Sequence, residues 1–118
     1  MRVYQLAKEI MPDCFEDASL LAEHPVTVKV AGQLYAAVGS IAANLSEGYS
    51  RSSGKDRARI FEYALGSARE SIDWYESGER VLSEELVDKR IEILDEITRM
   101  LLAIIPRERK RKIDQFPK

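Results

Sequence analysis

The sequence SIAANLSEGYSR at residues 40–51 decides the fold of this chain, because it places hydroxyls, an amide and a carboxylate at the end of an otherwise apolar helix. Polar side chains in such a place need hydrogen-bond partners, since burying an unpaired polar group is costly. Small residues recur at helical spacing along the same helix, so one of its faces can let a neighbouring backbone approach closely. These small residues are Gly32, Ala36, Gly39, Ser40 and Ala43. We expect Gly66 and Ser67, on a later helix, to face them.

The composition is that of a single globular domain. Of the 118 residues, 45% are hydrophobic and 32% are charged, and no apolar run approaches the roughly 20 residues that span a bilayer. The N-terminus lacks the pattern of a secretory signal peptide. Cys14 is the one cysteine, which rules out an internal disulfide and a zinc site built on thiolates. We therefore expect a cytoplasmic protein with no membrane association.

Charge is distributed unevenly along the chain. The whole sequence carries a net charge of −2, whereas residues 107–112 alone carry +4. Residues 113–118 are neutral overall, so residues 1–106 carry −6. We expect residues 1–106 to form the folded domain and residues 107–118 to form a basic, mobile tail. An acidic body with a basic tail is not typical of a protein whose whole surface binds nucleic acid.

Apolar residues at spacings of three and four predict four helices, and no segment has strand-like alternation of useful length. The helices cover roughly residues 3–22, 26–48, 53–78 and 83–106. Pro12 should kink the first helix or make it restart, because proline lacks a backbone donor. The short connections favour an all-α, antiparallel up-down four-helix bundle.

Local signals mark the ends of the later helices. Ser53 and Ser83 are typical N-caps for the third and fourth helices, since a serine hydroxyl can accept from a free backbone N–H. Gly78 is expected to end the third helix, or Leu82 if the helix continues through the glycine. Pro106 is expected to end the fourth.

Two carboxylates, Glu47 and Glu70, fall in the apolar halves of helices expected to face each other. We interpret them as members of a structural polar cluster between helices, since a buried charge needs partners. The members of this cluster are Ser40, Asn44, Glu47, Ser67 and Glu70. The alternative is acid–base catalysis by the two glutamates, which no nucleophile or cofactor-binding motif accompanies. The single histidine, His24, lies in a loop, so we predict no catalytic residue, metal site or cofactor.

Basic residues gather in two segments that could contact phosphates. They are Arg51, Lys55, Arg57 and Arg59 in and after the second loop, and Arg107, Arg109, Lys110, Arg111 and Lys112 near the C-terminus. Ion pairing with glutamates on neighbouring helices is the alternative for the first segment. Three aromatic residues, Tyr35, Trp74 and Tyr75, are predicted as anchors of an interface between subunits, because aromatic side chains concentrate at interfaces.

Two motifs at this separation resemble those of a known family. The first comprises Gln33-Leu34, Ala37, Ser40-Ile41, Asn44-Leu45, Glu47-Gly48-Tyr49 and Arg51, and the second comprises Ala64, Gly66-Ser67 and Glu70. Residues 93–102 are similar to the family's closing helix. The family is a bacterial four-helix-bundle family first noticed as reading frames within intervening sequences of large-subunit ribosomal RNA genes. Its relatives include accessory variability determinants of diversity-generating retroelements.

The resemblance implies a left-handed antiparallel bundle that assembles into a ring-shaped homopentamer and is not an enzyme. It also implies that retroelement relatives bind a reverse transcriptase and nucleic acid through a basic surface. This chain departs from the family pattern, because Tyr35 and Ala36 replace two arginines and Leu65 replaces another. Ala42 stands where the family usually has proline. The lost arginines favour an apolar subunit interface at these positions.

The sequence therefore supports two functions. The first is a cytosolic, non-enzymatic scaffold or adaptor whose main partner is itself, assembled as a ring, with a pentamer expected. It is motivated by the second and third helices, which offer more apolar surface than one bundle can bury. The alternative is an accessory protein that binds RNA or DNA through the two basic segments.

Overall fold

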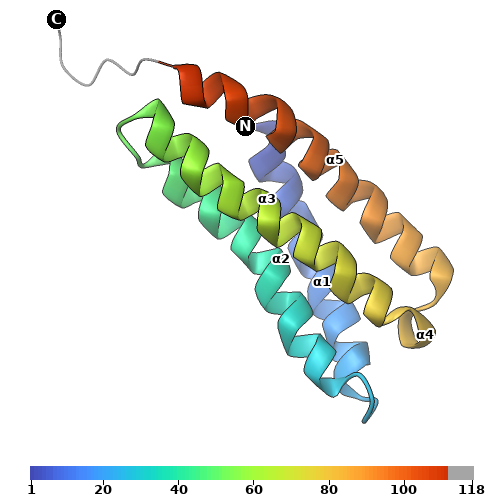
Figure 1. Ribbon diagram of the computed structural model, residues 1–118. Helices are drawn as coiled ribbons and strands as arrows, with labels where there is room; N and C mark the ends of the chain where they lie inside the picture. Colours follow the sequence, from blue (N-terminus) through green and yellow to red (C-terminus); the bar gives the residue numbers. More distant parts are fainter. Residues whose placement is uncertain (112–118) are drawn as a thin grey trace, which may run out of the picture.

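The computed structural model describes residues 1–111, which form five α-helices and no strand. They are α1 (Arg2–Ala22), α2 (Val28–Tyr49), α3 (Gly54–Ser77), α4 (Glu79–Leu82) and α5 (Glu84–Lys110). The four long helices run up and down as an antiparallel bundle, and α4 is a single turn between α3 and α5 (Figure 1). The molecule is a rod of 58 × 20 × 18 Å. The predicted all-α antiparallel four-helix bundle is confirmed.

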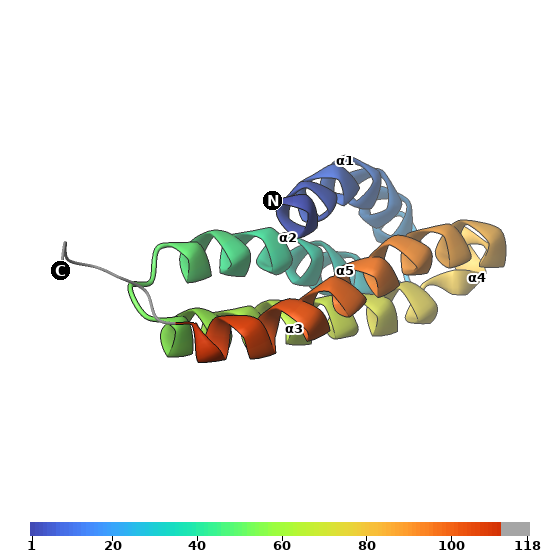
Figure 2. The same ribbon diagram turned by 90° about the horizontal axis from the view of Figure 1, so that it is seen from above.

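The four long helices do not pack equally. Helix α1 packs along α2, α2 along α3, and α3 along α5, whereas α1 and α5 contact each other much less. Figure 2 shows the first half of α1 standing apart from the last turns of α5. The bundle therefore has one open seam, between α1 and α5, at the end where α1 begins.

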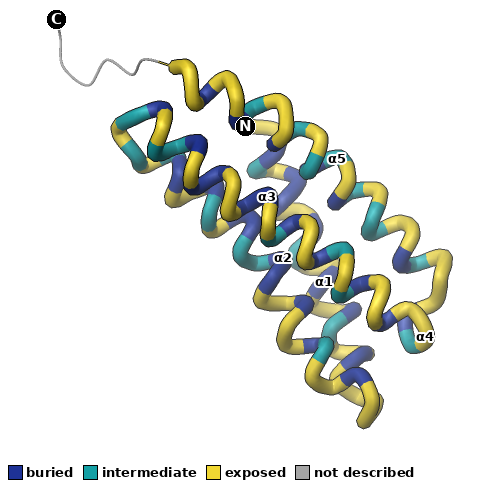
Figure 3. The backbone as a smooth tube through the Cα atoms, viewed as in Figure 1, coloured by how far each residue is buried: buried dark blue, intermediate teal, exposed yellow. Residues whose placement is uncertain are grey.

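The core is made by apolar stripes that follow helical spacing. In α2 the fully buried side chains include Leu34, Ile41 and Leu45, and in α5 they include Leu94 and Leu101. Burying one such leucine or isoleucine contributes about 1.5–3 kcal/mol. These stripes line the inside of the bundle, while the outer faces are mostly exposed (Figure 3).

Most of the small-residue face of α2 lies on the outside of the bundle, contrary to the prediction. Gly32, Ala36 and Ala43 are exposed, and Gly66 is exposed on α3. A methyl group added at Gly32 or Gly66 would meet no atom within 4 Å. The larger side chains of α2 occupy its inner face, so the pairing of this face with Gly66 and Ser67 does not occur.

Side-chain caps fix the starts of two helices as predicted. The Ser53 hydroxyl accepts from the backbone N–H of Asp56 at 3.1 Å, and that of Ser83 accepts from Leu86 at 3.2 Å. Helix α3 ends at Ser77, with Gly78 as its C-cap, and the short α4 follows. Each cap satisfies a backbone donor that the helix itself leaves free.

The two prolines do not end their helices. Pro12 lies inside α1, which does not restart there, and α5 continues past Pro106 to Lys110. The prediction that Pro106 ends the helix and that the tail begins at residue 107 was therefore wrong. Ile105 just before the proline and Glu108 beyond it are both buried, and basic residues in the last turn suit the negative end of the helix dipole. Lys112 lies outside the described residues.

Gly54 allows the start of α3 to approach the end of α5 closely. A methyl group there would overlap the backbone carbonyl oxygens of Glu108 and Arg111. Because backbone atoms cannot rotate away, only glycine fits this position.

We expect Gly54→Ala to lower the free energy of unfolding by about 1–3 kcal/mol, through the forced separation of α3 from α5. Gly66→Ala is the matched control, because it adds a methyl group to α3 in open space and should be neutral or stabilising by up to about 1 kcal/mol. Urea denaturation measures both. Equal stability of the two variants would contradict the close approach.

Candidate functional site

Three of the five residues predicted to form a polar cluster use their side chains in hydrogen bonds to residues one turn away instead. Glu47 is exposed and accepts from Arg51 at 2.6 Å, and Glu70 is exposed and accepts from the indole N–H of Trp74 at 3.2 Å. Ser40 donates to a carbonyl of its own helix. Within residues 1–111, no hydrogen bond between helices joins Ser40, Asn44, Glu47, Ser67 and Glu70. The predicted cluster is therefore wrong, because the two carboxylates lie on outer faces.

The buried polar cluster is a different one and joins three helices. Asp17 of α1 accepts from the Tyr75 hydroxyl of α3 at 2.6 Å and from Arg90 Nε of α5 at 2.7 Å. A second nitrogen of Arg90 donates to the other Asp17 oxygen at 3.3 Å. The Asp17 side chain is only 2% exposed, so its charge depends on these partners. The cluster ties the second half of α1 to both α3 and α5.

The electrostatics of this cluster favour a fixed, unreactive arrangement. Burial and the hydrogen bond donated to Asp17 raise the pKa of Tyr75, and the hydrogen bond to Asp17 raises the pKa of Arg90. Burial raises the pKa of the Cys14 thiol to about 11, so the thiol stays protonated at neutral pH. A protonated, buried thiol is a poor nucleophile.

Sequence reasoning missed this cluster, although a signal was present. The buried positions of α1 recur at spacings of three and four, and Asp17 occupies one of them between Cys14 and Leu21. Arg90 falls between Val87 and Leu94 on the apolar stripe of α5 in the same way. Opposite charges on two core stripes indicate a buried ion pair.

The three predicted interface aromatics have three different environments. Tyr75 is completely buried in the core of its own chain, so it cannot be a subunit contact and that prediction was wrong. Trp74 is half-buried on α3. Tyr35 is 41% exposed and Phe15 is 57% exposed. Their rings pack edge to face, with centroids 6.0 Å apart.

The fold brings the two basic segments to the same end of the rod. The α2–α3 connection lies beside the last turns of α5 (Figure 1), and Gly54 touches the α5 backbone there. We call residues 47–62 and 107–111 the basic end; they contain eight basic and four acidic residues. Residues 73–90, at the opposite end, contain six acidic and three basic residues. The net charge is therefore positive at the basic end and negative in residues 73–90 at the opposite end.

Half of the cations at the basic end are neutralised by ion pairs. The pairs are Arg51 with Glu47, Arg59 with Asp56, Arg109 with Glu62 and Arg111 with Glu108. Lys55, Arg107 and Lys110 form no ion pair within the described part of the chain, and Arg57 lies over the ring of Tyr49 at 5.7 Å. In the first segment, Arg51 and Arg59 thus pair with acids about one turn away and not with glutamates of a neighbouring helix, so the predicted alternative does not describe these pairs.

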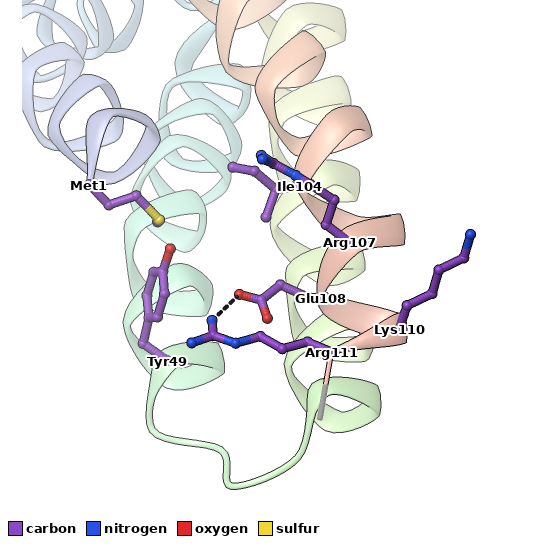
Figure 4. A pocket seen from close by; sticks show the side chains of 7 residues that line it. All are labelled: Met1, Tyr49, Ile104, Arg107, Glu108, Lys110 and Arg111. Atoms are coloured by element: carbon purple, nitrogen blue, oxygen red, sulfur yellow. Dashed lines mark hydrogen bonds and ion pairs between the residues drawn. The ribbon is translucent and has the colours of Figure 1, made fainter. Parts of the chain in front are cut away.

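A hollow of about 650 Å³ opens at the basic end, at the seam between α1 and α5 (Figure 4). Its lining residues are Met1, Tyr49, Ile104, Arg107, Glu108, Lys110 and Arg111. Glu108 is buried and holds Arg111 at 3.2 Å. Among the described residues, the second Glu108 oxygen and Nε of Arg51 are buried without hydrogen-bond partners. Unsatisfied polar atoms are rare in folded proteins, and here both belong to the basic end.

Two features are absent from residues 1–111. No helix there is both long enough and apolar enough to cross a membrane. No three His, Cys, Asp or Glu side chains in that range converge as ligands of a metal ion would.

These features define a small four-helix-bundle protein whose two ends carry opposite net charges. The chain belongs to the 23S rRNA-intervening sequence protein family, whose model matches residues 1–103. It is similar to the crystal structure of a protein with unknown function from the S23 ribosomal protein family of Bacteroides thetaiotaomicron. The TM-score is 0.81 at 23% identity, over 87% of this chain and 97% of that one, so this likeness shows the fold alone. Comparison with curated proteins finds no match.

We expect Asp17→Asn to lower the free energy of unfolding by about 3 kcal/mol, because Arg90 would lose its buried counter-charge. Asp73→Asn, on the exposed face of α3, is the control and should change stability by less than about 0.5 kcal/mol. Thermal or urea denaturation compares the two. If both variants match the parent chain, the cluster does not hold α1 in place.

Proposed function

We propose that this chain is a cytosolic, non-enzymatic scaffold or adaptor that assembles with copies of itself into a ring, with a pentamer as the expected form. The observation that carries the proposal is the Phe15 and Tyr35 pair on the outer surface of α1 and α2. The core is closed without these two rings, so their apolar surface is free for a second subunit.

The surroundings of this pair suit a packed interface. Val28, Gly32 and Tyr35 fall at helical spacing on α2, and all three are exposed. Gly32 has open space above it, which would let a helix of another copy approach closely. Gly39 lies on the same face of α2, next to Met11 of α1. The terminal methyl of Met11 is 3.7 Å from the position that a Cβ on Gly39 would occupy. The proposed interface therefore includes Tyr35 and excludes the buried Tyr75. No exposed apolar neighbour among the described residues supports including Trp74.

The non-enzymatic part of the proposal is supported by what the candidate acids do. Glu47 and Glu70 are both exposed and each bonds to a residue one turn away in its own helix. Of the two buried carboxylates in residues 1–111, Asp17 already has both oxygens occupied by Tyr75 and Arg90, and Glu108 is ion-paired with Arg111 through one oxygen. A general acid or base needs a carboxyl group that can reach a substrate.

We expect Tyr35→Glu to lower the mass of the assembly, because a charge would be buried at the centre of the interface. Tyr63→Glu is the matched control, since Tyr63 is a similarly exposed aromatic on α3. Light scattering coupled to size-exclusion chromatography measures mass, and far-ultraviolet circular dichroism checks the helices. An unchanged mass for Tyr35→Glu, or an equal loss for Tyr63→Glu, would contradict this interface.

A second candidate function, binding of RNA or DNA, is favoured by a specific observation. Two basic segments far apart in the sequence lie together at one end of the rod, where Lys55, Arg107 and Lys110 have no ion-pair partners in residues 1–111. Cations without internal partners can release the counterions of phosphates on binding. The acidic opposite end would be kept away from the nucleic acid, so contact would be made end-on.

The double variant Arg107→Ala/Lys110→Ala should weaken nucleic-acid binding and flatten its salt dependence by about one to two units of slope in log K against log salt. Arg99→Ala, an exposed arginine further back on α5, should leave the slope unchanged. Fluorescence anisotropy over a salt series measures the slope. If neither RNA nor DNA binds the parent chain even at about 50 mM salt, this second function is contradicted.

A further inference from the structure

We infer that the hollow at the basic end binds one unpaired nucleotide of a single-stranded nucleic acid. In this arrangement the base packs against tyrosine and the phosphate lies against the cations of α5. The inference rests on the second candidate function and gives that function a specific site and a preferred form of ligand.

The hollow owes its existence to the way α1 is held. The second half of α1 is fixed by Asp17, whereas its first half follows α2 and stands apart from the last turns of α5 (Figure 2). Met1 and Tyr49 therefore face Ile104 and Arg107 across an open space (Figure 4). Its volume of about 650 Å³ lies within the ~300–1,000 Å³ range of small-molecule pockets. A smaller hollow of about 340 Å³ adjoins it and adds Tyr4 and Ser46.

The walls of the site differ in chemistry. Met1 before α1 and Tyr49 at the end of α2 form one wall of the larger hollow, and they also line the smaller one, where Tyr4 adds a second aromatic ring. The last turns of α5 form the other wall and carry Arg107, Lys110 and Arg111. A ligand that fits both walls has a flat, weakly polar part and an anion attached to it. A nucleotide has this construction, and tyrosine beside a basic groove is a recurring arrangement in proteins that bind single strands.

Glu108 is an acidic residue in the lining of a basic site, and its contact with Arg111 indicates its role there. Its side chain is nine-tenths buried, and one of its oxygens accepts from Arg111 at 3.2 Å. The carboxylate thereby holds the Arg111 guanidinium across the floor of the hollow, below the Tyr49 ring (Figure 4). Glu108 is thus a positioning residue for Arg111. Tyr49 is itself held from the α3 side, by the ring of Phe61 in an edge-to-face arrangement with centroids 5.1 Å apart and by the Arg57 guanidinium.

The shape of the site favours single strands over duplexes. In a duplex the bases are stacked and paired, so only phosphates and groove edges can meet the protein. The cations of α5 could contact those phosphates, but the tyrosine wall would be left empty. In a single strand one base can leave the stack and pack against an aromatic ring.

The test compares a fluorescein-labelled oligoadenylate of about a dozen nucleotides with a duplex of the same length, by fluorescence anisotropy at low salt. For Tyr49→Leu we expect single-strand binding to fall by about tenfold and duplex binding to change by less than about twofold. Tyr63→Leu removes an exposed aromatic that also lies beside an arginine, Arg59, and should change neither affinity. Tyr4→Leu removes the aromatic ring of the adjoining hollow without touching the contact between Tyr49 and Phe61, in case Tyr49→Leu does not fold.

The outcomes separate the inference from the function on which it rests. If Tyr49→Leu and Tyr4→Leu bind the single strand as tightly as the parent chain, while Arg107→Ala/Lys110→Ala weakens both ligands, the basic end binds backbone alone. The nucleotide site is then overturned and the second function stands. If the parent chain binds neither the oligoadenylate nor the duplex, both are overturned. A selective loss of single-strand binding in the two tyrosine variants supports the site.

Discussion

One buried carboxylate determines how the first helix sits in this bundle. Asp17 lies on the apolar stripe of α1, where an unpaired charge would cost several kcal/mol. Arg90 from α5 neutralises the charge and the Tyr75 hydroxyl from α3 donates a further hydrogen bond, so the carboxylate has both partners only when three helices are in register. The contact fixes the second half of α1 and leaves its first half to follow α2. The open seam between α1 and α5 is a consequence of this arrangement.

That arrangement leaves two surfaces unused by the fold. The outer face of α1 and α2 presents the Phe15 and Tyr35 rings beside a glycine, and the open seam presents a hollow among cations. The two surfaces differ in chemistry: the first is apolar and suits another copy of the chain, and the second is basic with tyrosines at one side. A ring of subunits would multiply weak contacts at the basic end through avidity. The proposed self-assembly and the proposed nucleic-acid binding would therefore be compatible in one molecule.

Most of the fold could be predicted from the sequence because its signals are local. The Ser53 and Ser83 caps and the helical spacing of apolar residues depend only on near neighbours in the chain. The buried ion pair could not be predicted in the same way, because Asp17 and Arg90 are separated by most of the chain. The available signal for this ion pair was the position of two charged residues on core stripes. Glu47 and Glu70, near the small residues of α2 and α3, instead led to the wrong polar cluster. The prediction that Pro106 ends the helix was wrong because the packing of Ile105 before it and of Glu108 after it outweighs the loss of one backbone donor.

Association through the outer face of α1 and α2 is the claim on which the proposed function depends. Sedimentation equilibrium of the parent chain at micromolar concentration measures it most directly. The expected result is a pentameric mass, as a single species over a range of loading concentrations, against 13.4 kDa for one chain. A mass of 13.4 kDa throughout that range would contradict self-assembly and leave the exposed pair of rings without a role.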